Sequence, residues 1–139
     1  DRPTEATAIK SVKIRLIQRF FRDTVLASYD NSCAMCRLSI PRLLIASHII
    51  PWSINDERRA DPTNGLSLCS LHDKAFDAGL VGINEQNIIM VSSEVSEICD
   101  CKLCHVAFTE LYGQPINLPS RFIPDPECLA YHRDKIFIA

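Results

Sequence analysis

Two pairs of soft metal ligands with matching spacing stand in the first half of the sequence. Cys33 and Cys36 form the motif CAMC, and Cys69 and His72 form the motif CSLH. Two thiolates three positions apart in a turn make half of a tetrahedral zinc site, and CSLH offers a second half of the same spacing. A redox pair is the alternative for CAMC, and a small buried apolar side chain is the alternative for Cys69. We therefore expect Cys33, Cys36 and Cys69 to contribute to a structural Zn²⁺ site.

A third group of soft ligands lies further along the chain, in the motif CDCKLCH. Its thiols could complete the site begun by CAMC, form a site of their own, or remain as reduced surface thiols. The sequence alone does not choose among these outcomes, so the fourth ligand of the structural zinc stays open. The candidates for it are His72, Cys99, Cys101 and Cys104.

A histidine, an asparagine and a histidine–aspartate pair have the types and the order that phosphodiester hydrolysis needs. His48 lies in the apolar run LLIASHIIPWS, and Asn64 closes the loop that follows it. His72 and Asp73 lie in a short predicted helix. A neutral imidazole can take a proton from water near pH 7, and carboxylate or imidazole ligands can hold a cation that stabilises the phosphate. Considered locally, His48 could instead be a buried core histidine.

Together these motifs resemble the HNH endonucleases, whose fold is the ββα-metal (His-Me finger) fold. The segments ASHIIPWS, NGLSLC and LHDKAFDAGL are similar to those of bacterial HNH proteins of the restriction-endonuclease type, and the likeness extends over most of residues 18–137. The resemblance implies that His48 is the general base, and that Asn64 holds the loop and orients this base. It also implies DNA as the substrate, with 5′-phosphate and 3′-hydroxyl ends as the products.

The resemblance leaves the ligand of the catalytic cation open between two neighbouring residues. Counting from Asn64 places the usual histidine ligand at Asp73, whereas His72 falls where many relatives have a zinc cysteine. We favour His72 and keep Asp73 as the second choice, with Mg²⁺ or Mn²⁺, or else Ni²⁺ or Zn²⁺, as the cation. Asp77 is expected to be structural. Ser47 stands where some relatives have a metal ligand, so water and DNA phosphate would complete the coordination shell.

The remaining basic residues near these motifs suggest where DNA would bind. Arg58 and Arg59 lie in the long loop and are candidate phosphate contacts, with solvated loop charges as the alternative.

An alternative function for the whole protein is a catalytically inactive, zinc-stabilised DNA-binding module on the same scaffold. The poor metal ligand at Ser47 and the acidic charge balance motivate it.

The hydrophobic pattern predicts the elements that must position these residues. Apolar side chains recur near the helical period over residues 5–29, which predicts a long amphipathic helix. Other segments predict strands over 42–50, 65–68 and 87–92, and helices over 70–79, with Ser70 as its cap, and 126–137. We expect an α+β fold with a ββα-metal core, a long N-terminal helix and an irregular, proline-rich C-terminal extension. One nuclease domain over 1–139 would then divide into 1–30, 31–80 and 81–139.

Composition narrows the class of protein further. A net charge of −2 argues against broad electrostatic binding to nucleic acid, although it does not exclude a nuclease with a bound cation. The 7 cysteines without a visible secretory signal favour a metal site in a reducing cytoplasm over a disulfide framework. No apolar run approaches a membrane span, so no membrane association is expected. A homodimer, further domains or a cognate methyltransferase are partners that the resemblance leaves open.

Overall fold

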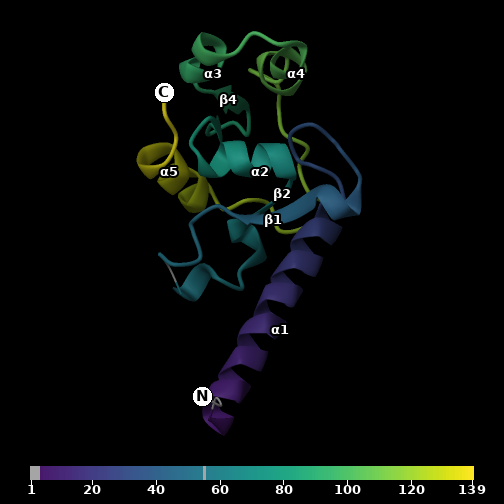
Figure 1. Cartoon of the computed structure of the whole chain (residues 1–139), viewed down its shortest axis with the longest axis vertical. Coiled ribbons are helices and arrows are strands. Elements are labelled where there is room, and N and C mark those ends of the chain that lie inside the picture. The colour runs from purple at the N-terminus through teal and green to yellow at the C-terminus, as the bar shows by residue number, and fades with distance from the viewer. Residues whose placement is uncertain (1–3, 55) are drawn as a thin grey trace.

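The fold is described by a computed structural model that covers residues 4–54 and 56–139. Its longest element is helix α1, Glu5–Ser28, which Thr4 caps by accepting a hydrogen bond from the Thr7 amide at 3.1 Å. The first half of α1 projects away from the body of the protein (Figure 1). The predicted helix over 5–29 is confirmed. Within the described residues, no helix combines the length and apolar character that crossing a bilayer requires.

A β-hairpin followed directly by a helix forms the centre of the molecule. Strands β1, Leu44–His48, and β2, Gly65–Cys69, are antiparallel, and helix α2, Ser70–Asp77, begins as soon as β2 ends. This is the predicted ββα arrangement. The first strand is shorter than predicted, because residues 41–43 form a 3-10 turn that begins at Pro41. The expected cap of α2 was wrong: Cys69, not Ser70, is the N-cap residue.

The C-terminal extension contains more regular structure than the sequence indicated. Strand β3, Val81–Ile83, pairs antiparallel with β4, Ile89–Val91, and only the second of these was predicted. Helices α3, Ser93–Ile98, and α4, Lys102–Cys104, and a π-helical turn, His105–Thr109, were also missed. Figure 1 shows them at the end of the molecule opposite the N-terminus of α1. The predicted last helix is present as α5, Pro126–Lys135.

The second half of α1 is packed directly on the hairpin, and a glycine makes the close approach possible. Phe21 and Val25 of α1 are almost fully buried. A Cβ atom at Gly65 would lie 2.5 Å from Cγ2 of Val25 and 2.8 Å from Cζ of Phe21, which is closer than real side chains approach. Gly65 is the partner of His48 in the strand register. Glycine at this position therefore lets α1 lie against the end of β1 where His48 is found.

A buried histidine joins α5 to α2 and gives the fold a specific pH dependence. The His132 ring stacks on Phe76, with ring centroids 3.6 Å apart, and its Nε2 atom donates to the Phe76 carbonyl oxygen at 2.8 Å. Burial lowers the pKa of His132 from 6.5 to about 4. The unfolded chain therefore binds one more proton than the folded chain between these two values, so stability falls as the pH decreases through this window.

We expect His132→Gln to remove most of this pH dependence, because a glutamine amide can donate the same hydrogen bond without titrating. Between pH 7 and pH 4.5 the wild type should lose about 2 to 3 kcal/mol more unfolding free energy than the variant. Urea unfolding at both pH values measures the difference. An equal loss in the two proteins would show that His132 does not take up a proton on unfolding.

Candidate functional site

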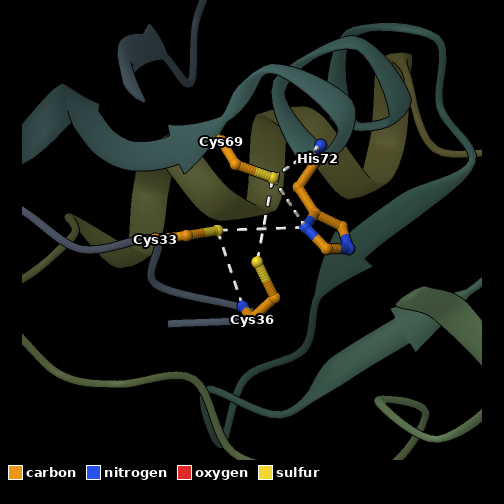
Figure 2. A group of neighbouring side chains, drawn as sticks. All are labelled: Cys33, Cys36, Cys69 and His72. Carbon is orange, nitrogen blue, oxygen red and sulfur yellow. Dashed lines mark hydrogen bonds between the residues drawn. The ribbon is translucent and has the colours of Figure 1, made fainter. Parts of the chain in front are cut away.

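The two predicted half-sites for zinc meet in one cluster. The ligand atoms of Cys33, Cys36, Cys69 and His72 all lie within 4.8 Å of one another (Figure 2). The Cys36 and Cys69 sulfurs are 3.8 Å apart, and Nδ1 of His72 lies 3.2 Å from the Cys69 sulfur and 3.9 Å from the Cys33 sulfur. Tetrahedral zinc with ordinary bond lengths would separate two sulfurs by about 3.8 Å, and a nitrogen and a sulfur by about 3.5 Å. The donor set and its spacing therefore fit a structural zinc ion.

Backbone geometry brings the two halves together. The Cys33–Cys36 turn is fastened to the hairpin by a hydrogen bond from the Ala34 amide to the Ser67 carbonyl at 2.7 Å. Arg37 follows the turn with a positive φ of 68°. On the other side, Cys69 ends β2 and its sulfur accepts from the His72 amide at 3.5 Å, within the first turn of α2. The cluster thus links a turn, the end of a strand and the start of a helix.

The second ring nitrogen of His72 fixes which atom faces the cluster. Nε2 lies 2.8 Å from the carbonyl oxygen of Ala107, and a carbonyl can only accept, so Nε2 carries a proton and Nδ1 is the ring atom that faces the thiols. The Phe108 ring packs edge-on against His72, with centroids 5.7 Å apart. Ala107 and Phe108 both belong to the π-helical turn. This turn of the C-terminal extension therefore completes the surroundings of the cluster.

The shifted pKa values of Cys69 and His72 also suit the binding of a cation, because they place negative charge on sulfur within the cluster. Hydrogen bonds from Cys33 and then from Cys36 lower the pKa of the Cys69 thiol far below its usual range, so this residue is a thiolate. Burial lowers the pKa of His72, but hydrogen bonds to Cys33 and Cys69 outweigh it and raise the value to about 10. Without a cation, the proton on the ring balances the thiolate charge. Binding of zinc would release this proton and the remaining thiol protons.

His48 lies at the end of β1, and three neighbours hold its ring. Its Nε2 atom is 3.0 Å from the carbonyl oxygen of Arg59 and therefore donates to it, which leaves the lone pair on Nδ1. The ring stacks on Phe21 with centroids 3.9 Å apart and planes 4° from parallel, and Trp52 contacts it edge-on. Burial lowers the pKa of His48, only partly opposed by the Arg59 carbonyl, so the ring is neutral near pH 7.

Asn64 joins the two ends of the long loop that carries these contacts. Its side chain is completely buried; Oδ1 accepts from the Ile50 amide at 2.8 Å, and Nδ2 donates to the Ile50 carbonyl at 3.0 Å. Nδ2 also lies 3.4 Å from the Arg58 carbonyl, and the Ile49 amide donates to the Asn64 carbonyl. The amide side chain thus fixes the loop just after His48 and just before Arg59, whose carbonyl orients the His48 ring.

A hollow beside β1 brings His48 together with two carboxylates. Its lining includes Ser47, His48, Trp52, Asp73 and Asp77. Asp73 and Asp77 are four positions apart on α2 and therefore share one face of that helix. Partial burial and the nearby charge of Asp73 raise the pKa of Asp77 to about 6, and Lys74 opposes the shift. The buried Ser47 hydroxyl, also in the lining, has no hydrogen-bond partner in the described part of the chain.

His72 and Asp73, the two candidates for the ligand of the catalytic cation, lie in different surroundings. The ring nitrogens of His72 are engaged with the thiol cluster and with Ala107, whereas Asp73 lines the hollow beside His48. Asp77 lies in the same hollow, although the sequence was interpreted as giving it a structural role. The sequence feature that indicates this placement is the spacing of Asp77, four residues or about one helical turn after Asp73. Phe21 was missed as a neighbour of His48, because no local pattern connects α1 to that residue.

The other predicted site residues are distributed as follows. Cys99, Cys101 and Cys104 are not part of the cluster with Cys33, and the structure gathers them elsewhere. The Arg58 guanidinium contacts three carboxylates, those of Asp61, Asp125 and Glu127. These ion pairs fasten the loop to the start of α5 and occupy the guanidinium that was predicted to contact phosphate. Arg59 lies over the Trp52 ring and donates to the Trp52 carbonyl.

Comparisons with known proteins give a family match for part of the chain and a similar fold. Residues 33–84 match a family model described as HNH endonuclease. A solved structure described as a modification-dependent TagI restriction endonuclease is similar, with a TM-score of 0.55 and 18% identity over 84% of this chain and 37% of that one. At this identity the likeness shows a shared fold, and this chain spans well under half of that chain's length. No curated protein matches the chain.

We expect His72→Ala to lose one equivalent of bound zinc and to lower the unfolding temperature by on the order of 10 °C, because the cluster would then have three protein ligands. His72→Cys should retain the ion, since a thiolate can replace imidazole in such sites. Metal analysis by mass spectrometry and thermal unfolding measure both effects. Wild-type zinc content in His72→Ala would show that the cluster does not need this ligand.

Proposed function

Because residues 33–84 match the family model described as HNH endonuclease, we propose that this protein is a metal-dependent endonuclease that hydrolyses DNA phosphodiester bonds. The observation that carries the proposal is the hollow in which His48 lies together with Asp73 and Asp77. A base of suitable pKa beside oxygen ligands for a hard cation is the combination that phosphodiester hydrolysis needs. DNA as substrate follows from the family and is supported by the fold shared with a protein named as a restriction endonuclease.

His48 is the general base in this proposal. Its Nε2 proton is donated to the Arg59 carbonyl, so Nδ1 is the atom free to take a proton from water. The lowered pKa keeps the ring neutral at physiological pH, and stacking on Phe21 holds its plane. Asn64 acts as a positioning residue, because it fixes the loop whose Arg59 carbonyl sets the tautomer of His48.

Asp73 and Asp77 would hold the divalent cation. Carboxylate oxygens suit Mg²⁺ and Mn²⁺, and these ions commonly keep several waters when few protein ligands are present. When bound, the cation would neutralise charge on the phosphate and stabilise the departing 3′ oxygen. Burial, and after it the nearby charge of Asp73, raises the pKa of Asp77, and a bound cation would offset both effects. The residues present therefore fit the cation that the family implies.

DNA would reach this hollow along α1. A second hollow shares His48 and Trp52 with the first and is also lined by Gln18 and Arg22 of α1. Arg15 and Arg19 precede Arg22 at helical spacing, so the three exposed cations continue along one side of α1 away from the hollow. Cations in such a row suit the phosphate backbone and carry no base specificity. A homodimer and a methyltransferase partner remain predictions.

One observation favours the alternative of an inactive DNA-binding module. Ser47, which is among the lining residues of the hollow, stands where some HNH proteins would have a metal ligand, and its buried hydroxyl has no hydrogen-bond partner among the described residues. An inactive module would bind DNA in the presence or absence of added metal and would not cut it. Nuclease and binding assays on the same preparation therefore distinguish the two functions.

We expect His48→Ala to reduce the rate of plasmid cleavage by about 10²- to 10⁴-fold, because water would lose its proton acceptor. Agarose gels of supercoiled plasmid incubated with Mg²⁺ or Mn²⁺ follow the reaction. His132→Gln is the matched control, since it replaces another buried histidine and should cleave like the wild type. Equal cleavage by the wild type and His48→Ala would contradict the assignment.

The variants Asp73→Asn and Asp77→Asn test each proposed cation ligand on its own. We expect both variants to need more Mg²⁺ for half-maximal cleavage than the wild type does, because an amide is a weaker ligand than a carboxylate. Neither should lose thermal stability, since each removes a charge from a pair that repels. Cleavage rates over a range of Mg²⁺ concentrations measure the effect. An unchanged Mg²⁺ requirement in both variants would place the cation elsewhere.

A further inference from the structure

A second group of thiols lies outside the segment that matches the family model. The sulfurs of Cys99, Cys101 and Cys104 lie within 4.8 Å of one another, and the Cys99 and Cys101 sulfurs are 3.6 Å apart. Cys99 is the residue after the end of α3, Cys101 is the N-cap residue of α4, and Cys104 is the last residue of α4. The chain thus turns from one short helix to the next around the three sulfurs.

Apolar burial does not account for the shape of this segment. From residue 96 to residue 106 no side chain is classed as buried, and Ile98 and Leu103 are 79% and 62% exposed. Helices of six and three residues are far too short to be stable without tertiary contacts. A cross-link between the three sulfurs would supply the missing constraint.

We propose that Cys99, Cys101 and Cys104 bind a second Zn²⁺ ion, distinct from the ion held by Cys33, Cys36, Cys69 and His72. Thiolates are soft ligands that select zinc or copper(I) over magnesium and calcium, and the sulfur separation matches that expected for two ligands of tetrahedral zinc. The exposed position of the sulfurs leaves the fourth coordination position to water. Three thiol protons leave to solvent as the ion binds.

The second ion would also affect the first site. Cys104 is followed directly by the π-helical turn, which presents the Ala107 carbonyl to Nε2 of His72 and the Phe108 ring to its face. Fixing the start of this turn fixes the groups that orient His72. The second ion therefore slows the loss of zinc from the first site.

Metal content tests the proposal without reference to nuclease activity. The triple variant Cys99→Ser, Cys101→Ser, Cys104→Ser replaces side chains that are exposed or half-buried and so leaves the hydrophobic core unchanged, and Lys102→Ala, in the same segment, is the matched control. All proteins are loaded with Zn²⁺ under reducing conditions, freed of excess metal and analysed by mass spectrometry. The triple variant should contain one zinc ion fewer per chain than the wild type and Lys102→Ala.

Cobalt gives a second measurement that reports the ligands directly. With Co²⁺ in place of Zn²⁺, the thiolate-to-metal absorption should fall by about half in the triple variant, because three of the six ligating thiols are removed. Equal metal content in the triple variant and Lys102→Ala, or equal cobalt absorption, would overturn the site. Copper in place of zinc in the freshly purified protein would overturn the choice of metal.

The rate at which zinc leaves the first site tests whether the second ion stabilises that site. With a chromogenic chelator, zinc should leave the first site several-fold faster in the triple variant than in Lys102→Ala. Identical rates for the first site would overturn the coupling.

Discussion

The contact of Cys33 and Cys36 with Cys69 and His72 is the constraint on which the rest of the site depends. It fixes where β2 ends and where α2 begins, because the Cys69 sulfur accepts from the His72 amide in the first helical turn. Neighbouring residues on a helix point in directions about 100° apart. Once His72 faces the thiols, Asp73 must face another side, and Asp77 follows it on the same face. The cluster therefore positions the two carboxylates without contacting them.

His48 is positioned by a separate set of contacts on the same hairpin. His48 and Gly65 are opposite each other in the register, and the missing side chain of Gly65 admits α1. Phe21 can then stack on the imidazole, while Asn64 holds the loop whose Arg59 carbonyl selects the tautomer. The first set acts through α2 and the second through β1 and its loop, so the distance from His48 to the two carboxylates depends on how firmly the hairpin and α2 are held together.

The parts of this structure that could be predicted from sequence are those set by local patterns. The long helix, the ββα order and the spacing of the cysteines are of this kind. The sequence could not predict that His72 faces the thiol cluster and Asp73 the hollow. A shift of the start of the helix by one residue turns each side chain by about 100°, and the sequence does not fix that start to one residue. The three partners of Arg58 could not be predicted either, since Asp125 and Glu127 reach it from a distant segment. Strand β3 has three residues, too few for a periodic pattern.

Adjacent residues on α2 also offer opposite kinds of ligand. His72 belongs to a donor set of sulfur and nitrogen, whereas Asp73 and Asp77 offer only oxygen. Soft donors bind zinc far more tightly than magnesium, and few-ligand carboxylate sites accept magnesium or manganese with water. One helix can thus serve a structural ion and a catalytic ion side by side without exchange between them. This separation by donor type would allow a structural ion to remain bound while a cation at the two carboxylates exchanged with solvent.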